Sequence, residues 1–344
     1  ETGVVVFPVK SLTVTVHVIF LSLAVVLVSP GLDKYVIVPV TVALPFPTAV
    51  SVHPVFAPLD TFTTFSLLLA HVIFVIILPA SVNVAVRPIV FALLIVLIAV
   101  LADVIVPYDP YEQDLSAALM PPDSHHLLGT DQYGRDMLSR VIKGAGISLS
   151  SSFALVVIIT LTGCIAGIIS GYYGGIIDSI IMRLSDIFLA FPGLVFAIAV
   201  ASVMSGGLVS AVIALALISW PKYARIARAE VLAIKNEPYI QVARMSGLNT
   251  IRILIKHIIP NIADMIIVTA VLDIGNMMME IAGLSFLGLG AEPPLAEWGL
   301  MVSQGRSFMQ TAPWVVIAPG LAIFITVLVF NMLGDTLSDI TGRQ

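Results

Sequence analysis

Charged residues are scarce in this chain. Lysine, arginine, aspartate and glutamate make up 11% of its 344 residues, hydrophobic residues make up 59%, and the mean hydropathy is +1.08. A soluble domain usually carries about 25% charged residues. The deficit excludes an ordinary soluble domain, so the sequence predicts an integral membrane protein.

Two further deficits narrow the possible chemistry. Cys164 is the only cysteine and lies in an apolar run, which excludes a disulfide framework or a cluster of thiolate metal ligands within the chain. The P-loop pattern of Gly, four residues and Gly-Lys-Ser/Thr is also missing. The chain therefore has no usual means of binding ATP, and energy for any pumping must come from another subunit.

Residues 1–86 differ in composition from the rest of the chain. They contain 22 valines and eight prolines but no arginine, methionine or tryptophan. The stretch SLTVTVHV alternates with the period of a β-strand, whereas FSLLLAHVIFVIILP is typical of a short membrane span. Two interpretations stay open: extra spans or an anchor, and translation of non-coding or frame-shifted DNA ahead of the true start. We assign this segment no function and place the membrane domain in residues 87–344.

Six apolar segments follow, each predicted to form a helix that crosses the bilayer. Residues 187–221 carry no charge over 35 residues, which is too long for one span, so we divide them at the SGG turn. Pro192 is expected to kink its helix, and Gly163 with Gly167 predicts close helix packing. The predicted spans are residues 88–107, 147–170, 185–204, 207–221, 264–286 and 314–336, and the short fourth span can extend past Pro221 into water.

The distribution of basic residues predicts the orientation. Seven of the sixteen lysines and arginines lie in residues 222–256, and loops rich in these residues remain in the cytoplasm. Residues 108–146 and 287–313 are then expected on the opposite side. Three basic residues in 108–146 mildly favour the reverse, but six acidic residues accompany them, and the cluster of seven outweighs them.

The cytoplasmic loop contains the stretch YIQVARMSGLNTIRILIKHIIPN at residues 239–261. Gly247 fits the position that follows a helix C-terminus, and Pro260 is expected to stop or kink the next helix. The pattern predicts two short helices joined by a turn beneath the membrane. On physical grounds alone, an amphipathic helix held at lipid headgroups by its arginines is the simpler interpretation. A knob that contacts a cytosolic partner is the alternative.

This loop resembles the EAA loop of ABC importer permeases. That pattern runs Glu-Ala-Ala, three residues, Gly, nine residues, Ile, one residue and Leu-Pro. The matching segment contains Gln241, Val242, Ala243, Arg244, Gly247, His257, Ile259 and Pro260. The spacing is kept, although Gln241 replaces the Glu and His257 the Ile. The resemblance implies that the loop docks into a groove on an ATP-hydrolysing subunit and transmits its movement to the membrane helices.

Four further blocks resemble the dipeptide, oligopeptide and nickel branch of these permeases. In the expected order they are HLLGTDQYGRDMLSR (126–140), GYYGGIIDSIIMRLSDIFLAFPGL (171–194), LSFLGLGAEPPLAEWG (284–299) and PGLAIFITVLVFNMLGD (319–335), whereas the C-terminal LSDITGRQ departs from the family's ending. The resemblance implies an all-α fold of six transmembrane helices with a cytoplasmic coupling-helix loop. It also implies a second permease subunit, two cytosolic subunits that bind ATP and Mg, an external solute-binding protein and membrane lipid as partners. No cofactor in this chain and no nucleic acid partner are expected.

The first of these blocks supplies candidate residues outside the membrane. Its glycines permit tight turns close to other backbone, and Asp136 with Arg140 at i,i+4 suits a helical ion pair. We expect a folded extracytoplasmic cap, and its functional extension would be contact with the binding protein or shaping of the outer gate. The motif residues are Gly129, Thr130, Asp131, Gly134, Arg135 and Asp136.

The fifth predicted span, residues 264–286, carries polar residues whose presence in an apolar helix needs an explanation. Asp273, Asn276 and Glu280 lie at i, i+3 and i+7, so they share a helix face. Ionisable groups at membrane depth face a bundle interior or a water-filled cavity. We favour a face that lines the translocation pathway, with hydrogen bonding to a neighbouring helix or to the partner permease as the alternative. No metal site is expected, because the adjacent His125 and His126 at a turn rarely converge on one ion.

The resemblance thus implies the permease subunit of an ATP-driven importer in the inner membrane. It implies a di- or oligopeptide as the cargo, or nickel as a complex with small organic ligands, and ATP hydrolysis in the partner subunits. A self-contained channel or secondary transporter is the alternative, but it would leave the cytoplasmic loop unexplained and would favour internal repeats with broken helices. An intramembrane enzyme is disfavoured because His257, the one histidine after residue 126, lies on the cytoplasmic side.

Overall fold

The computed structural model describes residues 86–342, except residue 205, and four short strands nearer the N-terminus. β1 (Val4–Val9) pairs with β2 (Leu12–His17), and β3 (Leu23–Val28) pairs with β4 (Tyr35–Val40), each as an antiparallel hairpin. The alternating stretch of the sequence corresponds to β2. The short span suggested by FSLLLAHVIFVIILP lies outside the described residues, and the origin of residues 1–86 stays a prediction.

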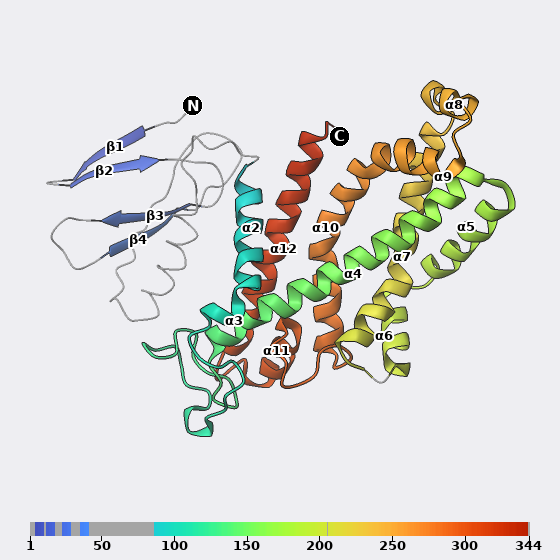
Figure 1. The fold of residues 1–344 in the computed structure, drawn as a ribbon. Coiled ribbons are helices and arrows are strands. Elements are labelled where there is room, and N and C mark those ends of the chain that lie inside the picture. Colours follow the sequence, from blue (N-terminus) through green and yellow to red (C-terminus); the bar gives the residue numbers. More distant parts are fainter. Residues whose placement is uncertain are drawn as a thin grey trace. The chain divides into compact units, whose positions relative to one another are not determined.

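Every regular element described from residue 86 onward is a helix (Figure 1). In chain order these are α2 (Val86–Val100), α3 (Ala102–Ile105), the 3-10 turn η1 (Leu115–Ala117), α4 (Met137–Tyr173), α5 (Gly175–Leu189), α6 (Gly193–Val203), α7 (Leu208–Ile234), α8 (Pro238–Met245), α9 (Thr250–Ile253), the π-helical turn η2 (Leu254–Ile258), α10 (Ile259–Phe286), α11 (Trp298–Gly305), η3 (Arg306–Phe308) and α12 (Trp314–Ile340). The predicted helical fold of the membrane domain is confirmed.

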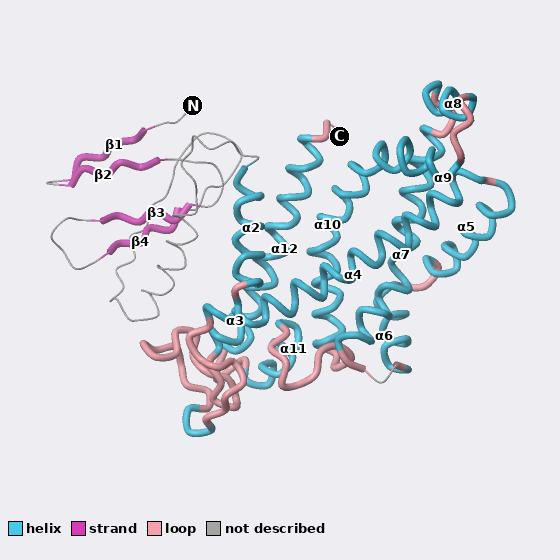
Figure 2. Tube along the Cα trace, in the orientation of Figure 1, coloured by secondary structure: helices cyan, strands magenta, loops and turns pink. Residues whose placement is uncertain are grey.

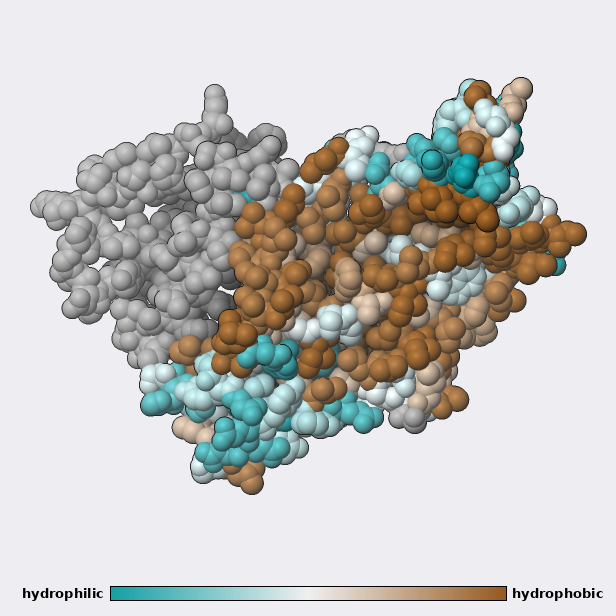
Figure 3. Space-filling model, viewed as in Figure 1, coloured by the Kyte–Doolittle hydropathy of each residue, from teal (hydrophilic) through white to brown (hydrophobic). Residues whose placement is uncertain are grey.

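The long helices have the length and composition of membrane spans. Among the described residues, α4, α7, the continuous segment from α9 to α10, and α12 are each long and apolar enough to cross a bilayer. The predicted spans 147–170, 264–286 and 314–336 lie inside α4, α10 and α12. Figure 3 shows a broad hydrophobic band over these helices between two hydrophilic ends, as expected of a multi-pass membrane protein.

Three predicted spans differ from the helices that form. The span 185–204 is two helices, because Pro192 cannot donate a backbone hydrogen bond, and α5 and α6 meet at 89°. The span 88–107 ends as α2 at Val100 and continues as the short α3. The span 207–221 extends as α7 to Ile234, with Pro221 inside the helix. The count of six spans therefore remains a prediction.

Small residues bring α4 and α7 into backbone contact. A Cβ added at Gly163 would lie 2.5 Å from the Trp220 carbonyl oxygen, and one at Gly167 would lie 2.8 Å from the Ala227 Cβ. Only glycine fits at such separations, so the close packing predicted from the four-residue spacing is confirmed. This contact fixes α7, which carries several of the polar side chains described below, against the longest helix of the bundle.

Two apolar cores lie along the bundle. One gathers buried side chains of α4, α6, α7 and α10 and includes Ile240 of α8 and Ile253 of α9. The other joins the first half of α4 to α10, α11 and α12 and includes Trp298. Loops collect at the bundle end that carries α3 and α11, whereas α8 and α9 project from the opposite end (Figure 2). Each core thus anchors one polar end of the bundle.

Replacing Gly167 by valine should separate α4 from α7 and lower the free energy of unfolding by about 1–3 kcal/mol, the usual cost of overpacking a tight interface. Thermal unfolding of the purified protein in detergent measures this. Gly320→Val is the matched control, because an added Cβ there meets no atom within 4 Å. Equal melting temperatures for the two variants would contradict the close α4–α7 contact.

Candidate functional site

α8 is fixed to the bundle along one side. Its Ile240 and Ala243 are buried in the same core as Ile253 of α9. The Arg244 guanidinium lies 5.1 Å from the centre of the Tyr172 ring at the end of α4, within the range of a cation–π contact. Because these contacts join α8 to the core of α4, α7 and α10, a displacement of α8 would reach the long helices.

A turn of defined geometry joins α8 to α9. Gly247 has a φ of +78° and follows the helix cap Ser246. The Gly247 N–H donates to the Arg244 carbonyl at 3.0 Å, and the Leu248 N–H donates to the Ala243 carbonyl at 3.3 Å. These two bonds form the Schellman pattern, which favours glycine at the left-handed position. The predicted place of Gly247, just past a helix C-terminus, is confirmed.

The outer side of this projection is apolar and open. The exposed fractions of Met245, Ile251 and Val242 are 87%, 65% and 61%. We name these three side chains the coupling surface. Beside them, the exposed Gln241 donates its side-chain amide to the Asn236 carbonyl oxygen at 2.8 Å. Apolar side chains gathered on a projecting element mark a site of protein contact, so this surface is suited to a partner subunit.

The last motif residues connect α9 to α10. His257 lies in the π-helical turn η2, and α10 begins at Ile259 with Pro260 in its first turn. A π-turn widens the helix by one residue, and proline at the start of a helix costs no hydrogen bond. The predicted stop at Pro260 is wrong, because the chain continues as helix from α9 through the π-turn into α10. A kink at Pro260 remains a prediction.

Two ion pairs attach the second half of α7 to α5. Arg228 donates from Nε and Nη2 to the Asp178 carboxylate at 2.5 and 2.6 Å, and Arg225 donates to Asp186 at 2.5 Å. The segment 222–256, which the sequence predicts on the cytoplasmic side, is helical up to Ile234, so the expected extension of the fourth span past Pro221 is present. Residues at i and i+3 of a helix face the same neighbour, and Arg225 and Arg228 accordingly both reach α5.

Lys222 lies in the same extension of α7, one residue after Pro221, and pairs with α10. Its Nζ lies 2.7 and 2.9 Å from the two carboxylate oxygens of Asp273. The Tyr223 hydroxyl donates to the same carboxylate at 2.9 Å, and the Asn276 side-chain amide donates at 3.2 Å. Three donors thus satisfy an aspartate that is 2% exposed. We name these four residues the polar cluster.

One side of the polar cluster stays open. The side chain of Lys222 is 49% exposed, Asn276 is exposed, and Glu280 is half-buried. Within the described part of the chain, the Glu280 carboxylate has no hydrogen bond or ion pair. Asp273 therefore fits the hydrogen-bonding interpretation, whereas Asn276 and Glu280 keep polar groups available beyond this chain. A pathway lined by all three remains a prediction.

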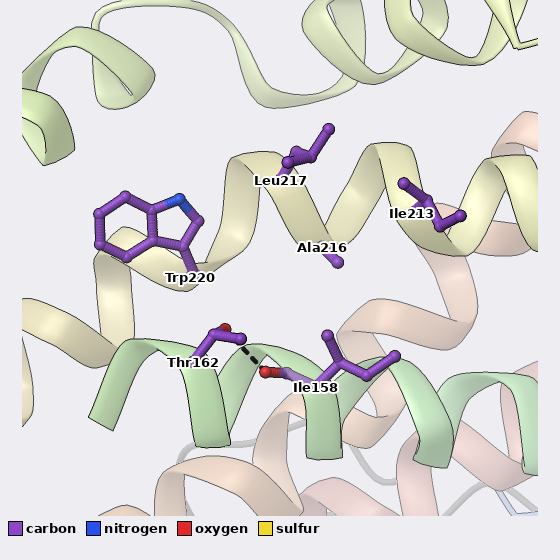
Figure 4. Close-up of a pocket in the computed structure, with 6 residues that line it drawn as sticks. All are labelled: Ile158, Thr162, Ile213, Ala216, Leu217 and Trp220. Atoms are coloured by element: carbon purple, nitrogen blue, oxygen red, sulfur yellow. Dashed lines mark hydrogen bonds between the residues drawn. The ribbon is translucent and has the colours of Figure 1, made fainter. Parts of the chain in front are cut away.

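An apolar groove of about 410 Å³ lies between α4 and α7 (Figure 4). Its lining is Ile158, Thr162, Ile213, Ala216, Leu217 and Trp220. The Thr162 hydroxyl donates to the Ile158 carbonyl oxygen at 2.7 Å, so the one hydroxyl in the lining is already satisfied. Without a charged group, the groove does not suit a charged cargo, and none of the polar cluster lines it.

At the other end of the bundle, two arginines share one aspartate. Arg135 donates from Nε to Asp131 Oδ2 at 2.7 Å, and its Nη2 reaches a side-chain oxygen of α11 at 3.4 Å. Arg140 donates to the Pro110 carbonyl at 2.9 Å, and its Nε lies 3.5 Å from the same Asp131 oxygen. The predicted Asp136–Arg140 pair is wrong, because these buried contacts turn Arg140 toward Asp131.

Asp136 instead caps α4. Its carboxylate accepts hydrogen bonds from the backbone N–H and the hydroxyl of Ser139, both at 2.7 Å, and lies 3.0 Å from His126 Nδ1. A capping carboxylate satisfies a helix N–H that has no partner within the helix. Among the described residues, no group of three or more His, Cys, Asp or Glu side chains is placed to hold a metal ion.

Glycine turns attach this block to α12. Gly129 and Gly134 have φ values of +71° and +73°. A Cβ at Gly129 would lie 2.6 Å from the Met120 carbonyl oxygen and 2.7 Å from Trp314 Nε1. That indole N–H donates to the carbonyl oxygen of the buried Thr130 at 3.1 Å. The block therefore forms a folded cap, as predicted, that joins the starts of α4 and α12. Its contact with a binding protein remains a prediction.

The sequence patterns did not single out Glu297. Its side chain is 1% exposed and caps α11 by accepting the Gly299 and Leu300 N–H groups at 3.0 and 2.8 Å. Burial raises the pKa of Glu297, and the hydrogen bonds from these backbone groups oppose that rise. The available signal was a lone acidic residue directly before Trp298, whose indole N–H donates to the Val141 carbonyl at 2.9 Å.

Two family models match the chain. The model described as the binding-protein-dependent transport system inner membrane component matches residues 163–343. The model described as the N-terminal TM domain of oligopeptide transport permease C matches residues 84–122. The first match covers more than half of the chain and includes the coupling surface and the polar cluster.

Curated relatives agree with these matches. The dipeptide transport system permease protein of Haemophilus influenzae is 43% identical over 73% of this chain and 87% of its own length. The glutathione permease of Pectobacterium atrosepticum is 44% identical over 75% and 86%, and the nickel permease of Escherichia coli is 39% identical over 72% and 89%. An inward-facing methionine ABC transporter structure shares the fold, with a TM-score of 0.50 at 19% identity, over 60% of this chain and 98% of that one.

Replacing Asp131 by asparagine should destabilise the protein strongly, because Arg135 and Arg140 would remain buried without a counter-charge. Removing one partner of a buried ion pair costs about 3–5 kcal/mol. Chemical unfolding in detergent measures the change, and Glu112→Gln on the exposed part of the same loop is the control. If both variants unfold at the same denaturant concentration, the buried network does not stabilise the cap.

Proposed function

The chain belongs to the inner-membrane permease subunits of binding-protein-dependent ABC importers, in the dipeptide, oligopeptide and nickel branch, and we propose that its coupling surface transmits the movement of an ATPase to a pathway beside the polar cluster. Proteins of this family work with ATP-binding and substrate-binding partners. The observation that carries the proposal is the exposed apolar surface on a helix whose other side is anchored in the core.

The coupling surface suits a groove on a cytosolic ATPase. It consists of three exposed apolar side chains, and the exposed Gln241 and Arg244 are the chain neighbours of Val242 and Met245 in α8. An apolar centre with a polar rim is the usual composition of a protein interface. ATP and Mg would bind in two such ATPase subunits, and this chain would contribute the contact that receives their movement.

The movement would pass from α8 to α10. α9, the π-turn and α10 are continuous, so a tilt of the projection changes the position of α10 relative to α7. Lys222 and Asp273 join these two helices. ATP binding and contact with the solute-binding protein would then shift the population between outward-facing and inward-facing arrangements.

A second, different permease subunit would complete the pathway. Asn276 and Glu280 lie on the open side of α10, and an ionisable group at membrane depth needs protein or water beside it. A partner subunit on this side would shield both residues from lipid. The exposed apolar residues of α2, α4 and α12 would then remain as the surface in contact with lipid.

We propose a short peptide as the cargo. Dipeptide and glutathione permeases are among the most similar relatives, and the open side of the polar cluster offers charged and amide groups to a polar molecule. A nickel complex is the second candidate, because the nickel permease is 39% identical over 246 residues.

Met245→Asp should release the ATPase subunits, because a carboxylate placed in an apolar interface must be desolvated. We expect the retained ATPase and the coupled ATP hydrolysis to fall about tenfold or more, which corresponds to roughly 1.4 kcal/mol per factor of ten. Co-purification of the complete importer measures the retention. Met309→Asp is the control, since Met309 is 58% exposed and lies between η3 and α12, outside the coupling surface. Full retention of the ATPases in the Met245 variant would overturn the docking proposal.

Uptake into proteoliposomes identifies the cargo. The importer is reconstituted into vesicles, and its binding protein is added to the outside solution. The vesicles should accumulate a labelled dipeptide only when they contain ATP. The same vesicles are offered nickel with a small organic chelator. Uptake of the nickel complex without uptake of any peptide would replace peptide by nickel as the cargo, and ATP-independent flux would favour a channel.

A further inference from the structure

Two ionisable side chains with free surface lie at different levels along α10 beside the polar cluster. Lys222 supplies an ammonium group at the level of Asp273, and Glu280 lies seven residues further along α10. Seven residues make nearly two full turns, so Glu280 lies on the same face of α10 as Asp273. At 1.5 Å per residue the two levels are separated by about 10 Å along the helix.

Both charged groups have capacity for another partner. A lysine ammonium has three N–H donors, and its known contacts are the two oxygens of a single carboxylate. The Lys222 side chain is 49% exposed, so its remaining donor can reach a second acceptor. The Glu280 carboxylate makes no hydrogen bond or ion pair within the described residues, so it can accept one from outside the chain.

This arrangement matches the charge distribution of a short peptide. A free dipeptide ends in an ammonium and a carboxylate, and its extended backbone spans roughly 7 Å at about 3.5 Å per residue. The flexible side chains of Lys222 and Glu280 can cover the remaining few ångströms. A metal complex of a single charge sign would use only one of the two groups.

We propose that Lys222 and Glu280 form a transient binding site for zwitterionic peptides, with the peptide carboxylate at Lys222 and the peptide ammonium at Glu280. Asn276, which lies between the two levels and is exposed, faces the bound peptide backbone. Asp273 holds Lys222 in place when no peptide is present. This inference rests on the proposed function, since it requires a peptide cargo.

Blocked peptides separate the two contacts. The complete importer in proteoliposomes is offered alanyl-alanine, its N-acetyl derivative and its C-terminal amide. For each peptide, uptake by a variant is divided by uptake by the protein it is compared with. Differences in how well the binding protein delivers the three peptides cancel in this ratio. Glu280→Gln should lower uptake of the free and amidated peptides about tenfold, the effect of losing a charge-assisted hydrogen bond. Uptake of the acetylated peptide, which lacks the ammonium, should stay within about twofold of wild type.

Lys222 is tested without leaving an unpaired buried charge. Lys222→Met combined with Asp273→Asn is compared with Asp273→Asn alone, because removing the lysine by itself would strand the aspartate. The double variant should take up the free and acetylated peptides about tenfold more slowly than the single variant, and the amidated peptide within about twofold. Equal losses on all three peptides would overturn the site and indicate a structural contact with the second permease.

Occupancy gives a readout that does not need the binding protein. In the complete importer, excess alanyl-alanine should slow alkylation of Asn276→Cys by a water-soluble maleimide, and Glu280→Gln should abolish this protection. Ser124→Cys, in the exposed loop of the cap, is the control. An unprotected thiol at position 276 would overturn the inference even if peptide uptake is normal. Failure of wild type to take up any peptide would overturn the proposed function instead.

Discussion

A buried carboxylate must be paired, and this condition at Asp273, whose side chain is 2% exposed within α10, organises the centre of the bundle. Lys222, Tyr223 and Asn276 supply its three donors. Two of these donors lie on α7, so the pairing fixes the position of α7 along α10. α7 can approach α4 only because Gly163 and Gly167 carry no side chain. The charge, the helix pair and the tight packing therefore depend on one another.

The two ends of the bundle meet the same physical demand in different ways. At the cap, buried arginines share Asp131 and backbone carbonyls, and the indole of Trp314 at the start of α12 donates to the Thr130 carbonyl. At the other end, α8 buries one side and exposes Met245 and its neighbours on the other. A rigid cap and a projecting apolar helix suit a subunit that is held at one side of the membrane and moved from the other.

Local patterns predicted much of this structure. The position of Gly247 past a helix, the close glycine packing and the three best-defined spans follow from residues within a few turns of one another. Contacts between distant residues could not be predicted in this way. Lys222 and Asp273 are 51 positions apart, so no pattern near Lys222 showed that its helix brings it to a carboxylate. Arg140 likewise lies beside Asp131 and not beside Asp136, four residues before it, because the folded cap buries the Arg140 side chain. Pro192 predicted a bend, but the 89° angle between α5 and α6 also depends on the contacts between α5 and α7.

The central claim has two halves. α8 docks into an ATPase subunit, and the polar side chains of α7 and α10 face a water-filled pathway. A cryo-electron microscopy map of the assembled importer, trapped with peptide and nucleotide, tests both halves at once. The account predicts Val242 and Met245 inside a groove of the ATPase, with Lys222 and Glu280 facing the pathway between two permease subunits. A map in which α8 touches no other subunit, or in which Lys222 and Glu280 face lipid, would contradict it.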